Sequence, residues 1–338
     1  MKSITYTFSF FAVLLLGFTS CSSESELVNR SENQSANQNC TVSFTLNNEE
    51  PSTRTDSPSG PTEFTTAALA REKAISSLYA LAFRKEGDAF YKMIKVELPT
   101  ESQSYTFNMQ QSGEFEFVLL ANPAESLVNE LTAKTAEFTL TDFPSVLVTQ
   151  EPGEKDGEES GLTNFLMTSE VKTNVSVTAN TTLELGAIEL TRLAARYDFY
   201  NQVNGLEMTG ITFTRRPAQS YMVKPMDQSG LTFTSDKEYT SANGVTALTS
   251  IGAIYSYEDI ADDDCALTLH GLLDGQPISK LIKFEERNIR RNCLYNIIIT
   301  ENDSPVTPDP HGKDDQLTFE VRVADWTTGE EISLRVMI

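Results

Sequence analysis

Histidine and tryptophan are almost absent from this 338-residue chain, which has two histidines and one tryptophan. Neither His270 nor His311 has a companion at metal-ligand spacing, and the G-x-S-x-G, P-loop and H-E-x-x-H motifs are missing. We therefore expect no catalytic residue, no metal site and no cofactor, and we predict that the protein is not an enzyme. A hydrolase with scattered carboxylates ranks last among the functions considered. His270 is expected to have a hydrogen-bonded structural role.

Basic residues are few: 26 Lys and Arg stand against 48 Asp and Glu, which gives a net charge of −22. A nucleic-acid-binding surface needs a basic footprint, so the composition argues against nucleic acid as a partner. Acidic residues gather at Glu258, Asp259 and 262–264, where either a calcium site or a solvated loop is conceivable. The irregular spacing of these carboxylates favours the solvated loop.

Cysteine is also scarce, with four residues in the chain. Cys21 is assigned to lipid attachment below, which leaves Cys40, Cys265 and Cys293. An odd remainder at wide spacing is neither a disulfide framework nor a zinc site. Cys265 and Cys293 either pair across neighbouring strands or remain buried thiols, and the pattern favours thiols.

No apolar run after the N-terminus is long enough to span a membrane. The first run, at 4–18, follows Lys2 and precedes Thr19-Ser20-Cys21, which reads as a lipobox. We predict a lipoprotein signal peptide at 1–20, lipidation of Cys21, and a polar tether at 21–39. The alternative is an ordinary secretory signal in which Cys21 has no such role.

From Cys40 onward, apolar and polar residues alternate with the period of a β-strand. The short spacing of the strands predicts an all-β protein, and about 300 residues exceed one core, so we expect two tandem antiparallel β-sandwich domains, at 40–185 and 186–338. One helix is expected, at 124–135. The first strand is predicted at 41–46 and the later ones at 75–83, 92–98, 104–109, 115–121, 183–190, 194–200, 208–214, 230–233, 252–257, 266–269, 279–284, 294–300, 317–323 and 332–338.

The two end strands of the mature chain share one pattern. The first strand is followed by a proline-rich loop, and a cut between Arg54 and Thr55 would separate this strand from the rest of the protein. The resulting groove suits a terminal strand from another copy, which produces head-to-tail growth into a filament. The alternative is two ordinary edge strands and an incidental arginine. The matching apolar residues are Val42, Phe44 and Leu46 in the first strand, and Ile332, Leu334, Val336 and Ile338 in the last.

Several segments resemble the fimbrillins of Bacteroidales, which build type V pili. They are TVSFTLNNEEPSTR at 41–54, FEFVLLAN at 115–122, NFLMTSE at 164–170, IELTRLAARYDF at 188–199, and RRNCLYNIIIT at 290–300, followed by LTFEVRVADW at 317–326. The resemblance implies two transthyretin-like sandwiches, excision of the first strand by an arginine-specific protease, and a donor strand from the C-terminal segment of a neighbouring subunit.

Carried onto this sequence, the resemblance makes Arg54 the cleavage position and 332–338 the donor strand. Arg30 and Arg71 are rival cut sites. A cut after Arg30 leaves the first strand in place, and Arg71 precedes a strand that we expect in the core.

We thus expect a structural subunit of a cell-surface fimbria. Its predicted partners are other copies or related subunits, an arginine-specific protease, and the outer membrane through lipid on Cys21 before cleavage. It is then located in the extracellular fimbria. The alternative is a surface lipoprotein that binds a glycan or a host protein without polymerising. Tyr255 and Tyr257 are its candidate aromatic contacts, although core packing and strand propensity explain these two residues as well.

Overall fold

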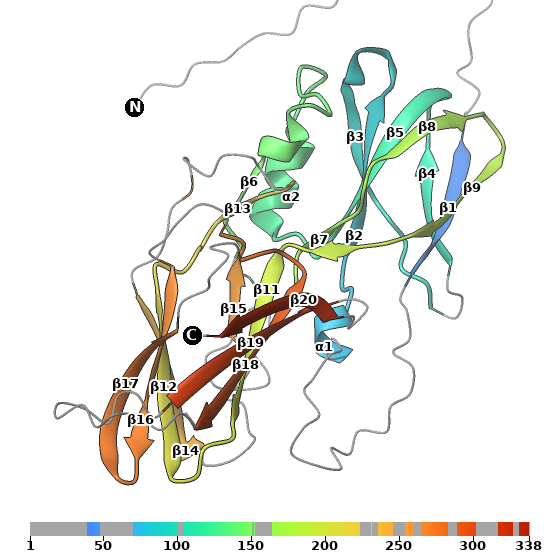
Figure 1. The fold of residues 1–338 in the computed structure, drawn as a ribbon. Coiled ribbons are helices and arrows are strands. Elements are labelled where there is room, and N and C mark those ends of the chain that lie inside the picture. The colour runs from blue at the N-terminus through green and yellow to red at the C-terminus, as the bar shows by residue number, and fades with distance from the viewer. Residues whose placement is uncertain are drawn as a thin grey trace, which may run out of the picture. The chain divides into compact units, whose positions relative to one another are not determined.

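The computed structural model describes most of the chain from residue 39 onward (Figure 1). The described residues are 39–47, 70–100, 104–150, 152, 164–223, 231, 236–245, 254–259, 265–282, 289–301, 317–326 and 331–337. They belong to one compact unit, Asn37–Ile338. Within these ranges, no helix combines the length and the apolar character that crossing a membrane requires.

Short strands make up the first half of the described chain, as the alternating pattern predicts. These strands are β1 (Cys40–Leu46), β2 (Leu78–Arg84), β3 (Phe90–Lys95), β4 (Ser104–Met109), β5 (Gly113–Ala121), β6 (Leu147–Val148), β7 (Met167–Thr168), β8 (Lys172–Val177), β9 (Thr182–Ile188) and β10 (Thr191–Arg192). The helical segments among them are α1 (Ala70–Lys73), η1 (Glu86–Asp88), α2 (Glu125–Thr132) and η2 (Phe143–Ser145).

The second half is also built of strands. They are β11 (Ala194–Asn201), β12 (Leu206–Thr214), β13 (Ser220–Tyr221), β14 (Lys237–Val245), β15 (Ile254–Tyr257), β16 (Ala266–Leu273), β17 (Gln276–Ile282), β18 (Cys293–Glu301), β19 (Leu317–Asp325) and β20 (Glu331–Met337). The strand predicted at 230–233 falls mostly outside the described residues.

Two sheets enclose the first hydrophobic core. The smaller has the order β4-β1-β9, and the larger has the order β10-β7-β5-β2-β3, with β8 also paired to β5. Val42 and Phe44 of the smaller sheet share this core with Ala80, Phe117 and Leu119 of the larger. Figure 1 shows these strands in blue to yellow-green.

The larger sheet is buried on both faces. On the side away from β1, Leu81 and Leu120 share a second cluster with Leu127 and Leu131 of α2. This double burial explains why β2 and β5 read as nearly continuous apolar runs instead of alternating ones. The helix that we predicted at 124–135 is therefore present as α2, although it ends at Thr132.

A second pair of sheets encloses the remaining core. Their orders are β15-β11-β18-β19-β20 and β14-β12-β16-β17. Tyr197 and Phe199 of β11 share this core with Phe213, Leu269 and Ile297. The prediction of an all-β fold of sandwiched, mainly antiparallel sheets is thus confirmed. Two neighbouring pairs are parallel, β1 with β9 and β11 with β18, which the alternation of residue types did not indicate.

The predicted division into domains at 40–185 and 186–338 stays a prediction. Residue 185 lies inside β9, and the chain continues through β10 into β11. The sheets on either side of this point have largely different cores, but the cluster around β1 also includes Ala194, Tyr255 and Trp326 from beyond it, and the described chain forms one compact unit.

Asn122 explains why β5 ends in Ala-Asn. Its backbone has a positive φ of 57°, a conformation that asparagine adopts more readily than most residues. Its buried amide accepts a hydrogen bond from Ser76 N at 2.8 Å and donates to the carbonyl oxygens of Ala74 and Phe165, both at 2.9 Å. Asn122 thereby ties the end of β5 to two segments that are distant in the sequence.

Candidate assembly site

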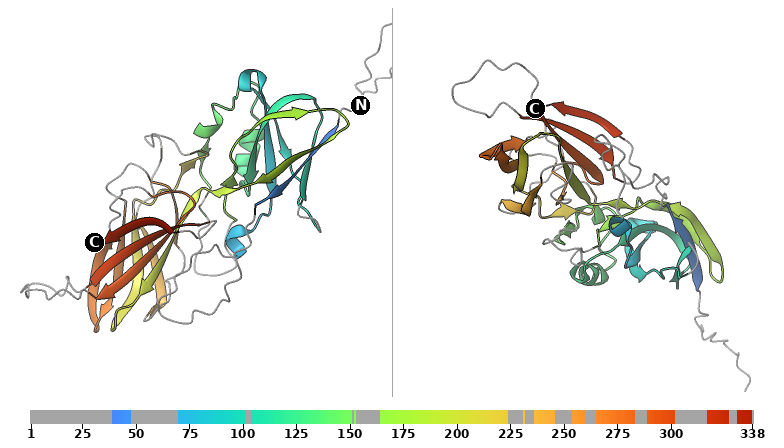
Figure 2. Two further views of the ribbon diagram at one scale, coloured as in Figure 1. Left: turned by 45° about the vertical axis from the view of Figure 1, so that its right-hand side comes forward. Right: turned by 90° about the horizontal axis from the view of Figure 1, so that it is seen from below.

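The first strand, β1, lies in the middle of the smaller sheet. It pairs antiparallel with β4, where Val42 is opposite Phe107 and Phe44 is opposite Tyr105. On its other side it pairs parallel with β9, where Val42 is opposite Leu183. Figure 2 shows β1 beside β9 from two further directions. Removing β1 would therefore leave unpaired backbone groups on both β4 and β9.

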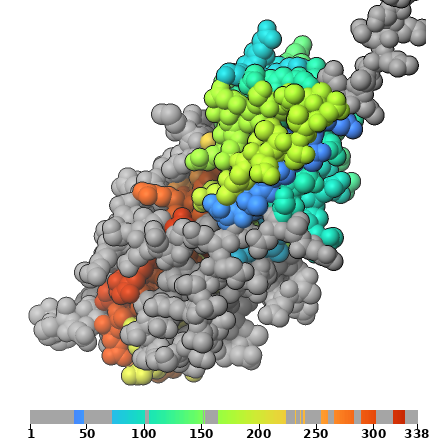
Figure 3. Space-filling view, turned by 90° about the vertical axis from the view of Figure 1, so that its right-hand side faces the viewer, coloured from blue at the N-terminus to red at the C-terminus, as the bar shows by residue number. Residues whose placement is uncertain are grey.

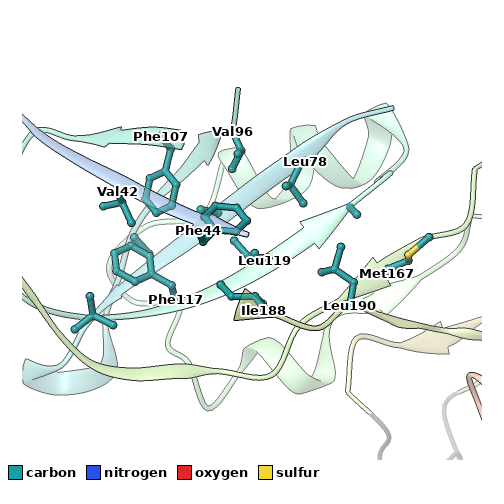
Figure 4. Packing of buried hydrophobic residues seen from close by; sticks show 14 of the residues in the cluster. Val42, Phe44, Leu78, Val96, Phe107, Phe117, Leu119, Met167, Ile188 and Leu190 are labelled. Carbon is teal, nitrogen blue, oxygen red and sulfur yellow. The ribbon is translucent and has the colours of Figure 1, made fainter. Parts of the chain in front are cut away.

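One face of β1 belongs to the protein core. Val42 is 0% exposed and Phe44 is 2% exposed, and Leu46 is partly buried against the same cluster. Figure 4 shows Val42 and Phe44 among side chains from the neighbouring strands and from the opposite sheet, including Phe107 and Phe117. β1 therefore has the buried apolar face that the sequence predicts.

Aromatic stacking fixes the position of Phe44. Its ring lies 5.5 Å from that of Tyr105, with an interplanar angle of 15°, and 6.3 Å from that of Phe107 in an edge-on arrangement. Such pairs add to the free energy of area burial. Burial also raises the pKa of Tyr105 above its ordinary value. This phenol is therefore a reporter of whether the groove beneath β1 is filled.

The opposite face of β1 is at the protein surface. Figure 3 shows its blue atoms as a stripe between the yellow-green atoms of β9 and the teal atoms of β4. Thr45 is exposed. The polar contacts are few and weakly specific: Ser43 Oγ donates to Leu183 O at 3.3 Å, and Thr41 Oγ1 donates to Asn108 Oδ1 at 3.1 Å. No described side chain of β1 carries a charge.

The last described strand, β20, lies at the end of its sheet and pairs with β19. Its backbone includes the predicted donor positions Ile332, Leu334 and Val336, while Ile338 lies outside the described residues. Cys21, Arg30, Arg54 and Thr55 also lie outside the described residues, so lipidation and cleavage stay predictions. The structure does not bring β1 and β20 of one chain together, since they belong to different sheets.

Two other residue groups singled out in the sequence have structural roles. Tyr255 and Tyr257 are 2% and 1% exposed, so they cannot stack on a glycan, and that interpretation is wrong. Glu258 and Asp259 are buried instead of solvated, and Glu258 accepts a hydrogen bond from Arg291 Nε at 3.0 Å. The alternation of residue types along β15 did not indicate that both faces of this strand are covered.

One histidine and three cysteines lie in the described part of the chain. His270 contacts Thr212 Oγ1 at 2.7 Å and Ser279 Oγ at 3.3 Å through its two ring nitrogens, a hydrogen-bonded role, as predicted. Cys40, Cys265 and Cys293 are thiols. Among the described residues, no group of three His, Cys, Asp or Glu side chains is placed to hold a metal ion.

A buried polar cluster was missed by the sequence analysis. Glu72 of α1 is 0% exposed, and its carboxylate accepts hydrogen bonds from Arg196 Nη1 at 2.9 and 3.0 Å. It also accepts from Tyr255 Oη at 2.6 Å and from Trp326 Nε1 at 3.0 Å. Asp198 completes the cluster with an ion pair to Arg196 at 2.7 Å. The only sequence signal was two charged residues, Arg196 and Asp198, within an otherwise apolar strand.

The same fold occurs in solved structures of adhesion and fimbrial proteins. A putative cell adhesion protein from Parabacteroides distasonis ATCC 8503 is 18% identical, with a TM-score of 0.56 over 86% of this chain and 97% of that one. The tip fimbrial protein Mfa3 from Porphyromonas gingivalis, with a C-terminal truncation, is 14% identical, with a TM-score of 0.57 over 85% and 99%. A fimbrilin (fimA) from Porphyromonas gingivalis W83 is 15% identical, with a TM-score of 0.52 over 85% and 97%.

Sequence comparison identifies the family. No curated protein matches the chain. The family model of the major fimbrial subunit protein (FimA) matches residues 40–245, which is more than half of the chain and begins at the first residue of β1. The protein is therefore a structural subunit of a cell-surface fimbria, and it belongs to the FimA family of major fimbrial subunit proteins.

Proposed function

We propose that this subunit polymerises by exchange of its first strand. It is exported as a lipoprotein through Cys21, an arginine-specific protease cuts after Arg54, and β1 leaves the smaller sheet. The C-terminal strand of another copy, or of a related fimbrial subunit, then fills the groove between β4 and β9.

The observation that supports this proposal is the position of β1 in its sheet. It is a central strand whose inner face fills the core, whereas its outer face is at the surface and its polar contacts are few. Burying each of its three apolar side chains is worth about 1.5–3 kcal/mol, so an empty groove loses about 5–9 kcal/mol before the unpaired backbone is considered. A subunit in that state is strongly stabilised by any strand with matching alternation.

The position of β20 supports the donor role. This strand pairs with β19 and lies at the end of its sheet, so its departure does not break the sheet in two. Because groove and donor belong to different sheets, their contact is head-to-tail and continues along a filament instead of closing on itself.

Limited digestion with an arginine-specific protease tests the proposal. The full-length protein is expected to be monomeric, and digestion is expected to yield ladders that resist mild denaturation and whose subunits begin at Thr55. Arg54→Lys is the matched control, because it keeps the charge but removes the cleavage site. A chain that lacks 331–338 is expected to be cut but not to form ladders.

A monomer that persists after a clean cut between Arg54 and Thr55 would contradict strand exchange. Filaments isolated from cells give an independent measurement, since their subunits should also begin at Thr55. Subunits that retain 41–46 in assembled filaments would show that β1 is not excised.

A further inference from the structure

The cluster of Glu72, Arg192, Arg196, Tyr255 and Trp326 joins the two ends of the chain on which assembly depends. Glu72 lies in α1, which is the first described element after β1 and the loop that contains Arg54. Trp326 directly follows β19 and precedes β20. The indole nitrogen of Trp326 donates to Glu72 Oε2 at 3.0 Å, so the two chain segments meet at one buried hydrogen bond.

Trp326 is held from several sides. Its ring lies 5.1 Å from Phe165 in an edge-on arrangement and 5.8 Å from Tyr255 with an interplanar angle of 13°. The guanidinium of Arg192 lies 5.0 Å from its centroid, which adds a cation–π contact. The backbone nitrogen of Trp326 also donates to Asn292 O at 2.9 Å. Trp326, the last described residue before β20, is 0% exposed.

Glu72 is held equally firmly, through its backbone as well as its side chain. Arg192 Nε donates to Glu72 O at 3.0 Å, in addition to the hydrogen bonds that the carboxylate accepts from Arg196, Tyr255 and Trp326. Freeing Glu72 from this site would leave the buried guanidinium of Arg196 with Asp198 alone as its anionic neighbour in the cluster. Removing one partner from a buried ion pair is strongly unfavourable.

We propose that this cluster is an anchor that limits both steps of assembly. It protects the bond before Glu72 from the protease, and it holds Trp326 in place when the donor strand β20 leaves. The inference rests on the proposed function and adds positioning residues to it. Glu72 and Trp326 do not contact the protease or the neighbouring subunit. They act by keeping the processed chain attached at one end and the donor strand attached at the other.

The first consequence concerns the choice of cleavage site. A protease binds several residues around the scissile bond in an extended form, whereas the bond between Arg71 and Glu72 lies within helix α1 and carries the buried Glu72 on its C-terminal side. Cleavage there requires this segment to open first, and its rate then follows the population of the open form. The cluster therefore predicts that the bond after Arg71, a rival site in the sequence, is protected from cleavage.

The second consequence concerns the donor strand. β20 is paired with β19, whereas β19 is also paired with β18 along its whole length and ends at Asp325, next to the anchored Trp326. When β20 leaves, separation should therefore occur between β19 and β20. The indole should keep its surroundings in the filament.

Digestion of the full-length protein tests the first consequence. Glu72→Gln removes the negative charge and replaces one carboxylate oxygen by an NH2 group that cannot accept a hydrogen bond, so either the phenol of Tyr255 or the indole of Trp326 loses its acceptor. We expect this variant to be cut after Arg71 roughly tenfold faster than the natural chain, because opening of α1 is more frequent. Glu125→Gln, in the first turn of the exposed end of α2, is the matched control and should not change the products.

The N-terminal residues of the products distinguish the outcomes. Products of the Glu72→Gln variant that begin at position 72 support the anchor, whether or not the natural chain is cut after Arg54. If the variant is resistant at Arg71 like the natural chain, the anchor does not protect this bond and the inference is overturned. Absence of any product beginning at Thr55 would instead count against the proposed function.

Fluorescence of the natural protein tests the second consequence without a substitution, since Trp326 is the sole tryptophan of the chain. We expect the emission maximum and the accessibility of the indole to acrylamide to be the same in monomers and in assembled ladders. A red shift with greater quenching on assembly would show that Trp326 leaves with the donor strand, and would overturn the anchor. Failure to assemble at all would contradict the proposed function, whereas assembly with a shifted emission contradicts only the anchor.

Discussion

The two strands that begin the two pairs of sheets, β1 and β11, have the same kind of neighbours but different surroundings. Each lies between an antiparallel partner and a parallel one, β4 and β9 for β1, and β15 and β18 for β11. In β1 buried and more exposed residues alternate, whereas all eight residues of β11 are buried. Two strands with equivalent places in their sheets thus differ in burial: β1 buries the side chains of one face, and β11 buries those of both faces.

The side chains of the two strands differ in how far they require particular partners, as well as in burial. β11 contributes Arg196 and Asp198 to a buried polar cluster, in which each charge depends on named partners. β1 contributes apolar side chains and weakly bonded hydroxyls. A strand of this second kind can be replaced by another with the same alternation, since no buried charge has to be matched. The comparison gives a physical reason for proposing that β1, and not β11, is the strand that is exchanged.

The largest effect is expected from breaking the cluster at β11. Arg196→Ala leaves the carboxylates of Glu72 and Asp198 buried without this cation, which should lower the free energy of unfolding by about 3–5 kcal/mol. Urea denaturation of the full-length protein measures the loss. Arg322→Ala is the control, since its pair with Glu320 is partly exposed and should change the free energy by about 1 kcal/mol or less. Equal losses in the two variants would contradict the importance of the cluster.

A somewhat smaller effect is expected at β1. Phe44→Ala removes a buried ring and should lower the free energy of unfolding of the uncleaved chain by about 3 kcal/mol. Thr45→Ser, at the exposed neighbouring position, should change it by about 0.5 kcal/mol or less. Chemical denaturation distinguishes the two variants. If Phe44→Ala were as mild as Thr45→Ser, β1 would not be part of the core.

The smallest effect is expected in the pKa of a tyrosine side chain beside β1. Burial raises the pKa of both Tyr105, beside β1, and Tyr197, in β11, above the ordinary value of 10.0. A raised phenol pKa favours the neutral form in the folded state. Its contribution to stability is present below about pH 10 and is lost as the pH rises through the folded pKa. In a chain that lacks 331–338, where no donor strand refills the groove, excision of β1 exposes Tyr105 and should lower its pKa, while that of Tyr197 should not change.

Spectrophotometric titration of this truncated chain against its Tyr105→Phe variant, before and after excision of β1, isolates the signal of Tyr105. Tyr197→Phe provides the matched comparison. A Tyr105 pKa that excision leaves unchanged would show that the groove stays closed, and would weaken the distinction between the two strands.

Several strands were predicted within a few residues because alternation reports burial of one face. The first strand, predicted at 41–46, is β1 at Cys40–Leu46, and the strand predicted at 317–323 is β19 at Leu317–Asp325. The pattern failed where both faces are covered. For Tyr255 and Tyr257 it could not distinguish surface aromatics from core residues, and the structure buries both.

Helix α1 was not predicted, because four residues show no periodicity and Glu72 reads as an ordinary surface acid. Its buried position depends on Arg196, Tyr255 and Trp326, which are more than 120 residues away in the chain. No local pattern carries that information.

The sequence by itself determined that the chain is rich in short strands, that its first strand has one apolar face, and that no metal-binding motif is present. These are local properties, set by the period of side chains along a strand and by residue type. Only the tertiary structure decided that β1 is central in its sheet, that it runs parallel to β9, and that Glu72 meets Trp326. Those features depend on which distant segments pair and pack, because the free energy of a buried charge or an apolar ring is fixed by its neighbours in space and not by its neighbours in the chain.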